Sequence, residues 1–350
     1  MTLSFKSATL RVCDGWLGGT DDGQFVLQEQ RDPMFLRSLR AGLAAATAAA
    51  LAVFSAGTAQ AATLPYGYDF AAGFAATAAA PTTPPPGAND FSCRPTAAHP
   101  YPVILVHGTF GNMDDNWQTA SPLLAAHGYC VFALNYGGAT PTSIVQGTGD
   151  IAASAGQLAS FVNTVLAATG AAKVDLVGHS QGGMMPRYYI NFLGGDSTVD
   201  QLVGLASSNY GTASLGLFTL AGEVGSLLGI PPSTLLAACQ ACGQQGTGSS
   251  FLAHLNATPT VPAVRYTVIA SRDDEAVIPY TNSFLPAAPN VTNITVQDQC
   301  SVDATDHLEL AADPIALADV LNALDPAHPV QVPCVPVLPL TGPPGPVPAF

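Results

Sequence analysis

The chain has 350 residues, 48% of them hydrophobic and 10% charged, and 24 acidic residues against ten Lys and Arg give a net charge of −14. This apolar fraction is enough to fill a core, so an intrinsically disordered chain is excluded. From Ala62 onward only five basic residues accompany 19 acidic ones. Such scattered cations cannot neutralise a phosphate backbone, so nucleic-acid binding is excluded too.

The first 61 residues have the pattern of a targeting segment. Arg37 and Arg40 precede an uncharged, mostly apolar run at residues 41–56, and residues 59–61 read Ala-Gln-Ala, the small-x-small pattern of a cleavage site. We therefore expect residues 34–61 to be a secretory signal peptide that is cut before Ala62. Residues 1–33 are then a leader or a wrongly extended start. The mature protein is expected to be secreted and extracellular, with no transmembrane anchor.

Export changes the chemistry expected of the cysteines. Six remain after the cut, and an even number in an exported protein indicates disulfides. We expect them to pair as Cys93–Cys130, Cys239–Cys242 and Cys300–Cys334. The Cys239-Gln-Ala-Cys242 pair could instead be redox-active or bind zinc. Neither a thioredoxin-like βαβ context nor two further zinc ligands are visible nearby, which favours the local disulfide.

The mature chain is predicted to have a linker, one catalytic domain and a tail. Residues 62–90 contain a proline cluster and are expected to be the N-terminal linker, residues 91–328 the domain, and residues 329–350 an extended Pro-rich tail. Within the domain, short apolar runs predict strands, and longer periodic stretches predict helices. The expected strands are residues 103–106, 130–134, 173–177, 201–206, 264–270 and 290–296. The expected helices are residues 151–168, 181–193 and about 307–324.

Strands that alternate with helices are typical of βαβ units, so we predict an α/β fold with a mostly parallel central sheet flanked by helices. Residues 213–255 break the alternation, because they are apolar, rich in glycine and helical in character. We interpret them as a cap-like helical insertion over one edge of the sheet. Its apolar residues, Leu220 among them, are expected either to line a substrate cleft or to pack on the sheet.

The strongest chemical signal is Gly-His-Ser-Gln-Gly at residues 178–182, which follows a predicted strand and opens a predicted helix. At such a strand-to-helix turn the serine is held in a strained conformation with its hydroxyl presented. Gly178 and Gly182 are required because a side chain at either position would collide with neighbouring backbone. The pattern therefore predicts that Ser180 is a nucleophile. The N–H of Gln181, at the start of the helix, would stabilise an oxyanion.

Together with Val-His-Gly-Thr at residues 106–109, this motif resembles secreted bacterial lipases and esterases of the α/β-hydrolase fold. More narrowly, the HGTFGN and NW patterns, GHSQGG and a late DExxxP are similar to the class 2 lipases of high-GC actinobacteria. The resemblance covers about residues 91–329. It implies that Thr109 supplies the second oxyanion N–H, although the neighbouring Phe110 stays open as an alternative.

The order of a hydrolase triad along the chain is Ser, acid, His, so the base should follow the last strand. His307 does so and is expected to be the general base. For the acid, Asp273, Asp274 and Glu275 compete after the strand at residues 264–270, and the family motif selects Asp274. Asp303 and Asp306 lie close to His307 in sequence but are expected to be caps or surface charges.

The resemblance thus implies a serine hydrolase that cleaves carboxylic esters through an acyl-enzyme, like a triacylglycerol lipase or carboxylesterase. No metal or organic cofactor is implied. The expected partner is a small-molecule or lipid ester, also at a lipid–water interface, and the protein is expected to be a monomer. An acyltransferase or a cutinase-like polyester hydrolase would use the same triad, and a catalytically silent binding protein of the same fold is the remaining alternative.

Overall fold

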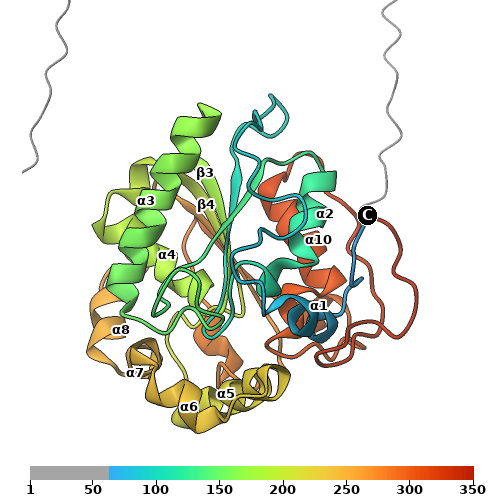
Figure 1. Ribbon diagram of the computed structural model, residues 1–350. Helices are drawn as coiled ribbons and strands as arrows, with labels where there is room; N and C mark the ends of the chain where they lie inside the picture. The colour runs from blue at the N-terminus through green and yellow to red at the C-terminus, as the bar shows by residue number, and fades with distance from the viewer. Residues whose placement is uncertain (1–62) are drawn as a thin grey trace, which may run out of the picture. The chain divides into compact units, whose positions relative to one another are not determined.

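The computed structural model describes residues 63–350, which form one unit around a six-stranded sheet (Figure 1). The predicted leader, the signal peptide and its cleavage site lie outside the described residues. The strand order is β2-β1-β3-β4-β5-β6, and every neighbouring pair is parallel. The strands are β1 (Val103–Val106), β2 (Val131–Leu134), β3 (Val174–His179), β4 (Val199–Leu205), β5 (Arg265–Ala270) and β6 (Val291–Thr295). All six predicted strands are present, so the predicted parallel sheet is confirmed.

Helices cover both faces of the sheet, as an all-parallel sheet requires. Figure 1 shows α3 (Ile151–Thr169) and α4 (Gln181–Phe192) on one face, and α2 (Ala120–Ala126) and α10 (Pro314–Leu324) on the other. Every residue of β1, β2 and β3 is buried, which explains their near-continuous apolar sequence. By length and composition α3 could cross a membrane, but its Ile151, Leu158 and Val162 side chains are buried in this core.

The insertion at residues 213–255 is helical, as predicted, but its place differs from the expected edge of the sheet. It forms α5 (Ser214–Leu228), α6 (Pro232–Ala237), α7 (Gln240–Gln245) and α8 (Ser250–Leu255). Hydrogen bonds join it to loops that follow the carboxyl ends of strands: Gln245 contacts Thr109 after β1 and Ser208 after β4. The insertion therefore covers the end of the sheet where Ser180 lies.

The final helix begins later than predicted. Asp313 caps α10 by accepting the N–H groups of Ile315 at 2.6 Å and Ala316 at 3.1 Å, and Pro314 occupies the first helical position, where a missing N–H costs nothing. These signals outweigh the helical pattern around residue 307. His307 consequently lies in a loop between β6 and α10, which also contains the four-residue helix α9 (Val296–Gln299).

The segment at residues 62–90 differs from the simple linker that its composition predicts. It contains α1 (Phe70–Thr77), whose Phe70 and Phe74 side chains are buried in the core. Asp69 caps this helix through the N–H of Ala72. The Pro-rich tail lacks helices and strands as expected, yet its Val337 is buried and its Leu340 carbonyl accepts the N–H of Ala71 at 2.9 Å.

The three expected disulfides are all present. Cys93–Cys130 joins the segment before β1 to the start of β2. Cys239–Cys242 closes the first turn of α7 inside the insertion. Cys300–Cys334 ties the tail to the loop that carries His307.

Candidate active site

Ser180 lies at the turn between β3, a central strand of the sheet, and α4. Its φ of 55° and ψ of −120° are strained for a residue with a side chain. A Cβ added at Gly178 would overlap the carbonyl of Gly182, and one added at Gly182 would overlap the carbonyl of Val106. The structure therefore supports the predicted reason for both glycines, since the tight turn leaves no room for a side chain.

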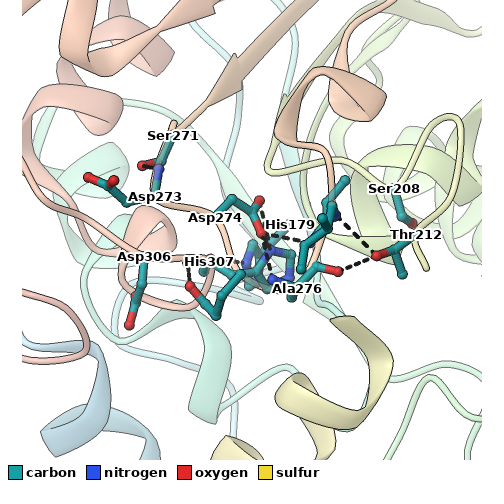
Figure 2. Close-up of polar contacts among 12 residues, drawn as sticks. His179, Ser208, Thr212, Ser271, Asp273, Asp274, Ala276, Asp306 and His307 are labelled. Carbon is teal, nitrogen blue, oxygen red and sulfur yellow. Dashed lines mark hydrogen bonds and ion pairs between the residues drawn. The ribbon is translucent and has the colours of Figure 1, made fainter. Parts of the chain in front are cut away.

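Asp274 and His307 are brought together although 33 residues separate them in the chain. The Nδ1 of His307 lies 3.0 Å from Oδ1 and 3.1 Å from Oδ2 of Asp274, and both side chains are fully buried (Figure 2). The carboxylate is itself held in place, because Oδ1 accepts the N–H groups of Ala276 and Val277. With Nδ1–H donated to the carboxylate, the neutral imidazole carries its lone pair on Nε2.

The competing acids do not bond this imidazole. Figure 2 shows Asp273 and Asp306 directed away from it. Asp303 and Asp306 accept backbone N–H groups in their own loop, from Thr305 and Glu309. Glu275 accepts the backbone N–H of His307 at 3.3 Å, which places it beside the imidazole without bonding the ring.

The environment of His307 favours its charged form. Burial lowers the pKa of the imidazole, but the negative charge and hydrogen bond of Asp274, with further charge from Glu275 and Glu223, outweigh it and raise the pKa to about 9. The Nε2 atom is buried and has no hydrogen-bond partner among residues 63–350. A buried nitrogen left without a partner is costly, and this atom is available for one further hydrogen bond.

Ser180 and His307 line the same small cavity, of about 10 Å³. Within the described part of the chain, no hydrogen bond joins the Ser180 hydroxyl to His307 Nε2. Phe70 and Phe74 of α1 form one wall of the cavity, and Leu220 and Val224 of α5 form another. The space suffices for about one water molecule.

Two backbone N–H groups are available near Ser180. Gln181 is the first residue of α4, whose N–H has no acceptor within the helix. Thr109 follows β1, and its hydroxyl accepts hydrogen bonds from the side chains of Gln181 at 2.8 Å and Gln245 at 2.9 Å. The N–H of Phe110 already donates to the carbonyl of Gln146 at 3.0 Å, which makes this alternative the less available donor.

His107 and His179 belong to the two sequence motifs, and the ring of His179 contacts two other segments of the site. His179 Nε2 lies 2.9 Å from the carbonyl oxygen of His307, and Nδ1 lies 3.2 Å from Oδ1 of Asn116, which also accepts the N–H of Gly108. Burial lowers the pKa of His179 to about 3 and that of His107 to about 4, so both rings stay neutral. Neither ring bonds the Asp274 carboxylate, which instead contacts His307.

Sequence reasoning missed several residues that shape this region. Phe70 and Phe74 come from a segment interpreted as a linker, and Gln245 bonds Thr109 across 136 residues of chain. None of the three belongs to a motif. The insertion contains three glutamines, at positions 240, 244 and 245, and no sequence signal distinguishes Gln245 from the other two.

Comparisons with known proteins agree with this architecture. The sequence model for "Lipase (class 2)" matches residues 100–317. A triacylglycerol lipase of Pseudarthrobacter phenanthrenivorans and another of Burkholderia plantarii are each 44% identical over 97 residues, which are 26% of this chain and 28% and 25% of theirs. The chain thus spans about a quarter of the length of these relatives.

Among solved structures, Aspergillus fumigatus lipase B superposes with a TM-score of 0.50 at 18% identity, covering 71% of this chain and 56% of that one. This likeness concerns the fold, and with the parallel sheet it confirms the predicted α/β-hydrolase architecture. The sequence match is more specific, since it covers more than half of the 350 residues. The chain belongs to the class 2 lipase family.

Proposed function

We propose that the chain is a secreted serine ester hydrolase, with carboxylic esters including triacylglycerols as substrates and Ser180, His307 and Asp274 as its catalytic triad. The observation that carries the proposal is the buried Asp274–His307 pair at 3.0 Å, next to Ser180 on its strained turn. The Nε2 of His307 has no partner among residues 63–350, and His307 and Ser180 line the same cavity. A nucleophile, a base and an orienting acid in this relation are what acyl transfer requires.

In the first half-reaction, Ser180 Oγ bonds the ester carbonyl carbon while His307 Nε2 takes the hydroxyl proton. The carboxylate of Asp274 stabilises the imidazolium and keeps its Nδ1–H in place. The N–H groups of Thr109 and Gln181 donate to the oxyanion of the tetrahedral intermediate. The ester C–O bond then breaks, and His307 returns the proton to the departing alcohol. Water repeats the sequence on the acyl-enzyme and releases the acid.

Secretion is part of the proposal. Three disulfides within residues 63–350 are compatible with an oxidising compartment. The signal-peptide pattern at residues 34–61 would direct the chain to export. Expression of the full chain in a secreting bacterial host should yield an extracellular protein that begins at Ala62. An intracellular product with an intact amino-terminal segment would contradict this part.

A fluorophosphonate probe tests the nucleophile directly. We expect a covalent adduct on the peptide that contains Ser180, and labelling slowed by several orders of magnitude in His307→Ala. An adduct on another residue, or none in folded protein, would contradict the assignment. Product analysis with an added alcohol separates the alternatives: a hydrolase yields mainly free acid, whereas an acyltransferase yields mainly the new ester.

A further inference from the structure

A buried serine joins the loop of the acid to the loop of the base, and it belongs to none of the motifs that predicted the site. Ser271 is the first residue after β5, three positions before Asp274, and its side chain is fully buried. Figure 2 shows it next to Asp273 at the start of the loop that carries Asp274. Its hydroxyl lies 2.5 Å from the carbonyl oxygen of Thr305, two positions before His307. One side chain thus bridges two loops that are 34 residues apart in the chain.

The partners of this hydroxyl fix the direction in which it donates. The backbone N–H of Asp273 donates to Ser271 Oγ at 3.1 Å, and Gln297 Nε2 donates to it at 2.8 Å. The amide of Gln297 is held in this orientation, because its Oε1 accepts the backbone N–H of Arg272 at 2.9 Å. A hydroxyl has two lone pairs and one proton. Both lone pairs are occupied, so the proton of Ser271 is donated to the Thr305 carbonyl.

The peptide of the base is thereby held at three points. Ser271 holds it from two positions upstream, through the Thr305 carbonyl. Glu275 Oε2 accepts the N–H of His307 at 3.3 Å. His179 Nε2 lies 2.9 Å from the carbonyl oxygen of His307. His307 lies in no helix or strand, so these contacts set where its ring lies, and the one made by Ser271 is the shortest.

We propose that Ser271 is a positioning residue, which sets the place of the His307 ring relative to the Asp274 carboxylate. The two carboxylate oxygens lie 3.0 and 3.1 Å from His307 Nδ1, and this contact requires the two loops to keep their relative position. Without the Ser271 hydroxyl, the Thr305 carbonyl loses its partner, and the loop of the base can shift. A misplacement of about 1 Å costs up to about 100-fold in rate. The effect on turnover rests on the proposed function, whereas the bridge between the loops does not.

Ser271→Ala removes the donated proton without adding bulk. We expect kcat for p-nitrophenyl butanoate to fall by about 10- to 100-fold while KM changes less than about twofold, because the base is displaced and the ester site is not. Ser271→Thr keeps the hydroxyl and should retain at least about half of kcat. Ser121→Ala is the matched control and should keep full activity. Ser121 is equally buried, and it donates to the carbonyl of Pro86, 35 residues away in the chain, at 2.8 Å.

A double-mutant cycle separates this role from a general loss of stability. Ser271 acts through the contact between Asp274 and His307, so its effect should vanish once that contact is gone. In the Asp274→Asn background, adding Ser271→Ala should lower kcat by less than about twofold. The same loss in both backgrounds would refute the proposal, because the hydroxyl would then act by another route.

The proton on His307 Nδ1 supplies a readout that needs no turnover. Its resonance in nitrogen-edited proton NMR is identified by its disappearance in His307→Ala, and it reports the bond to Asp274. Ser271→Ala should move this resonance upfield or broaden it through exchange with water. Ser121→Ala and Ser271→Thr should leave it unchanged. An unchanged resonance in folded Ser271→Ala would contradict the positioning role.

If Ser271→Ala does not fold, Gln297→Leu takes its place. It removes one of the two donors that direct the Ser271 hydroxyl, and kcat should fall about three- to tenfold, with the Nδ1 resonance moving in the same direction. Full kcat or an unchanged resonance in folded Gln297→Leu would then overturn the proposal. Failure of the proposed function looks different: fluorophosphonate would not label Ser180 in the unmodified protein, while the resonance changes would stand. If only the positioning role fails, the labelling stays intact.

Discussion

Leu220→Trp should shift the substrate preference toward shorter acyl chains. The Leu220 side chain is 4% exposed and lines the cavity that contains Ser180 and His307. We therefore expect an acyl chain that binds beside α5 to contact this side chain. A tryptophan there fills space that methylene groups would otherwise occupy, whereas Leu220→Ala opens it.

The magnitude follows from apolar burial. Each methylene that the pocket no longer buries costs about 0.8 kcal/mol, which corresponds to about a fourfold loss in kcat/KM. If the indole removes room for about two methylenes, the ratio of octanoate to butanoate turnover falls by about 15-fold. Leu220→Ala should raise the same ratio. The assay is a series of p-nitrophenyl esters from acetate to dodecanoate, measured on proteins of matched melting temperature.

Leu215→Trp provides the control, because Leu215 lies on the same helix with its side chain 70% exposed. Its chain-length profile should match that of the unmodified protein. The reasoning is refuted if both Leu220 variants fold and their profiles run parallel to the unmodified one across all esters. Leu220 would then merely pack on its neighbours.

Three further predictions concern charge. Asp274→Asn should lower kcat/KM by roughly 10³- to 10⁴-fold, because the imidazolium loses its stabilising carboxylate. Because His307 must be neutral to act as base and its pKa is raised to about 9, kcat/KM for a short ester should increase with pH up to that value. Burial raises the pKa of Asp175 to about 7, so the folded state holds an extra proton between pH 4 and 7 and loses stability as pH rises through that window. Relative to the unmodified protein, Asp175→Asn should therefore gain up to about 4 kcal/mol by pH 7.

For each of these three predictions, a specific result would contradict the reasoning. Asp273→Asn is the control for Asp274→Asn, since its side chain is exposed, and equal losses in both would contradict the assigned acid. A pH–rate profile that is flat from pH 6 to 9 would contradict the raised pKa of His307. Urea unfolding at several pH values checks Asp175, and a stability difference that does not change with pH would contradict its burial-shifted ionisation.

The sheet and the strained turn at Ser180 could be predicted because their causes are local. Strands buried on both faces need near-continuous apolar runs, and the turn at Ser180 needs glycine at positions 178 and 182. The pairing of an acid after β5 with His307 could be expected because the carboxyl ends of parallel strands meet at one end of a sheet. The choice of Asp274 over Asp273 and Glu275 depended on the resemblance to the family motif.

The walls of the site could not be predicted in the same way. The segment at residues 70–77 is rich in alanine and glycine and precedes a proline cluster, and its sequence does not reveal what Phe70 and Phe74 pack against. The contacts of Gln245 with Thr109 and with Ser208 join residues far apart in the chain. Such pairs leave no local pattern, since only the folded insertion brings them together.

The central claim is that Ser180 carries the reaction, and replacing it tests that claim most directly. Ser180→Ala removes the hydroxyl, and Ser180→Gly also relieves the positive φ of 55°. Ser160→Ala, on the exposed side of α3, is the matched control. Both Ser180 variants should lose at least about 10⁴-fold in kcat/KM for p-nitrophenyl butanoate with the fold intact, while the control keeps full activity. Retention of a tenth or more of the activity in either folded Ser180 variant would contradict the account.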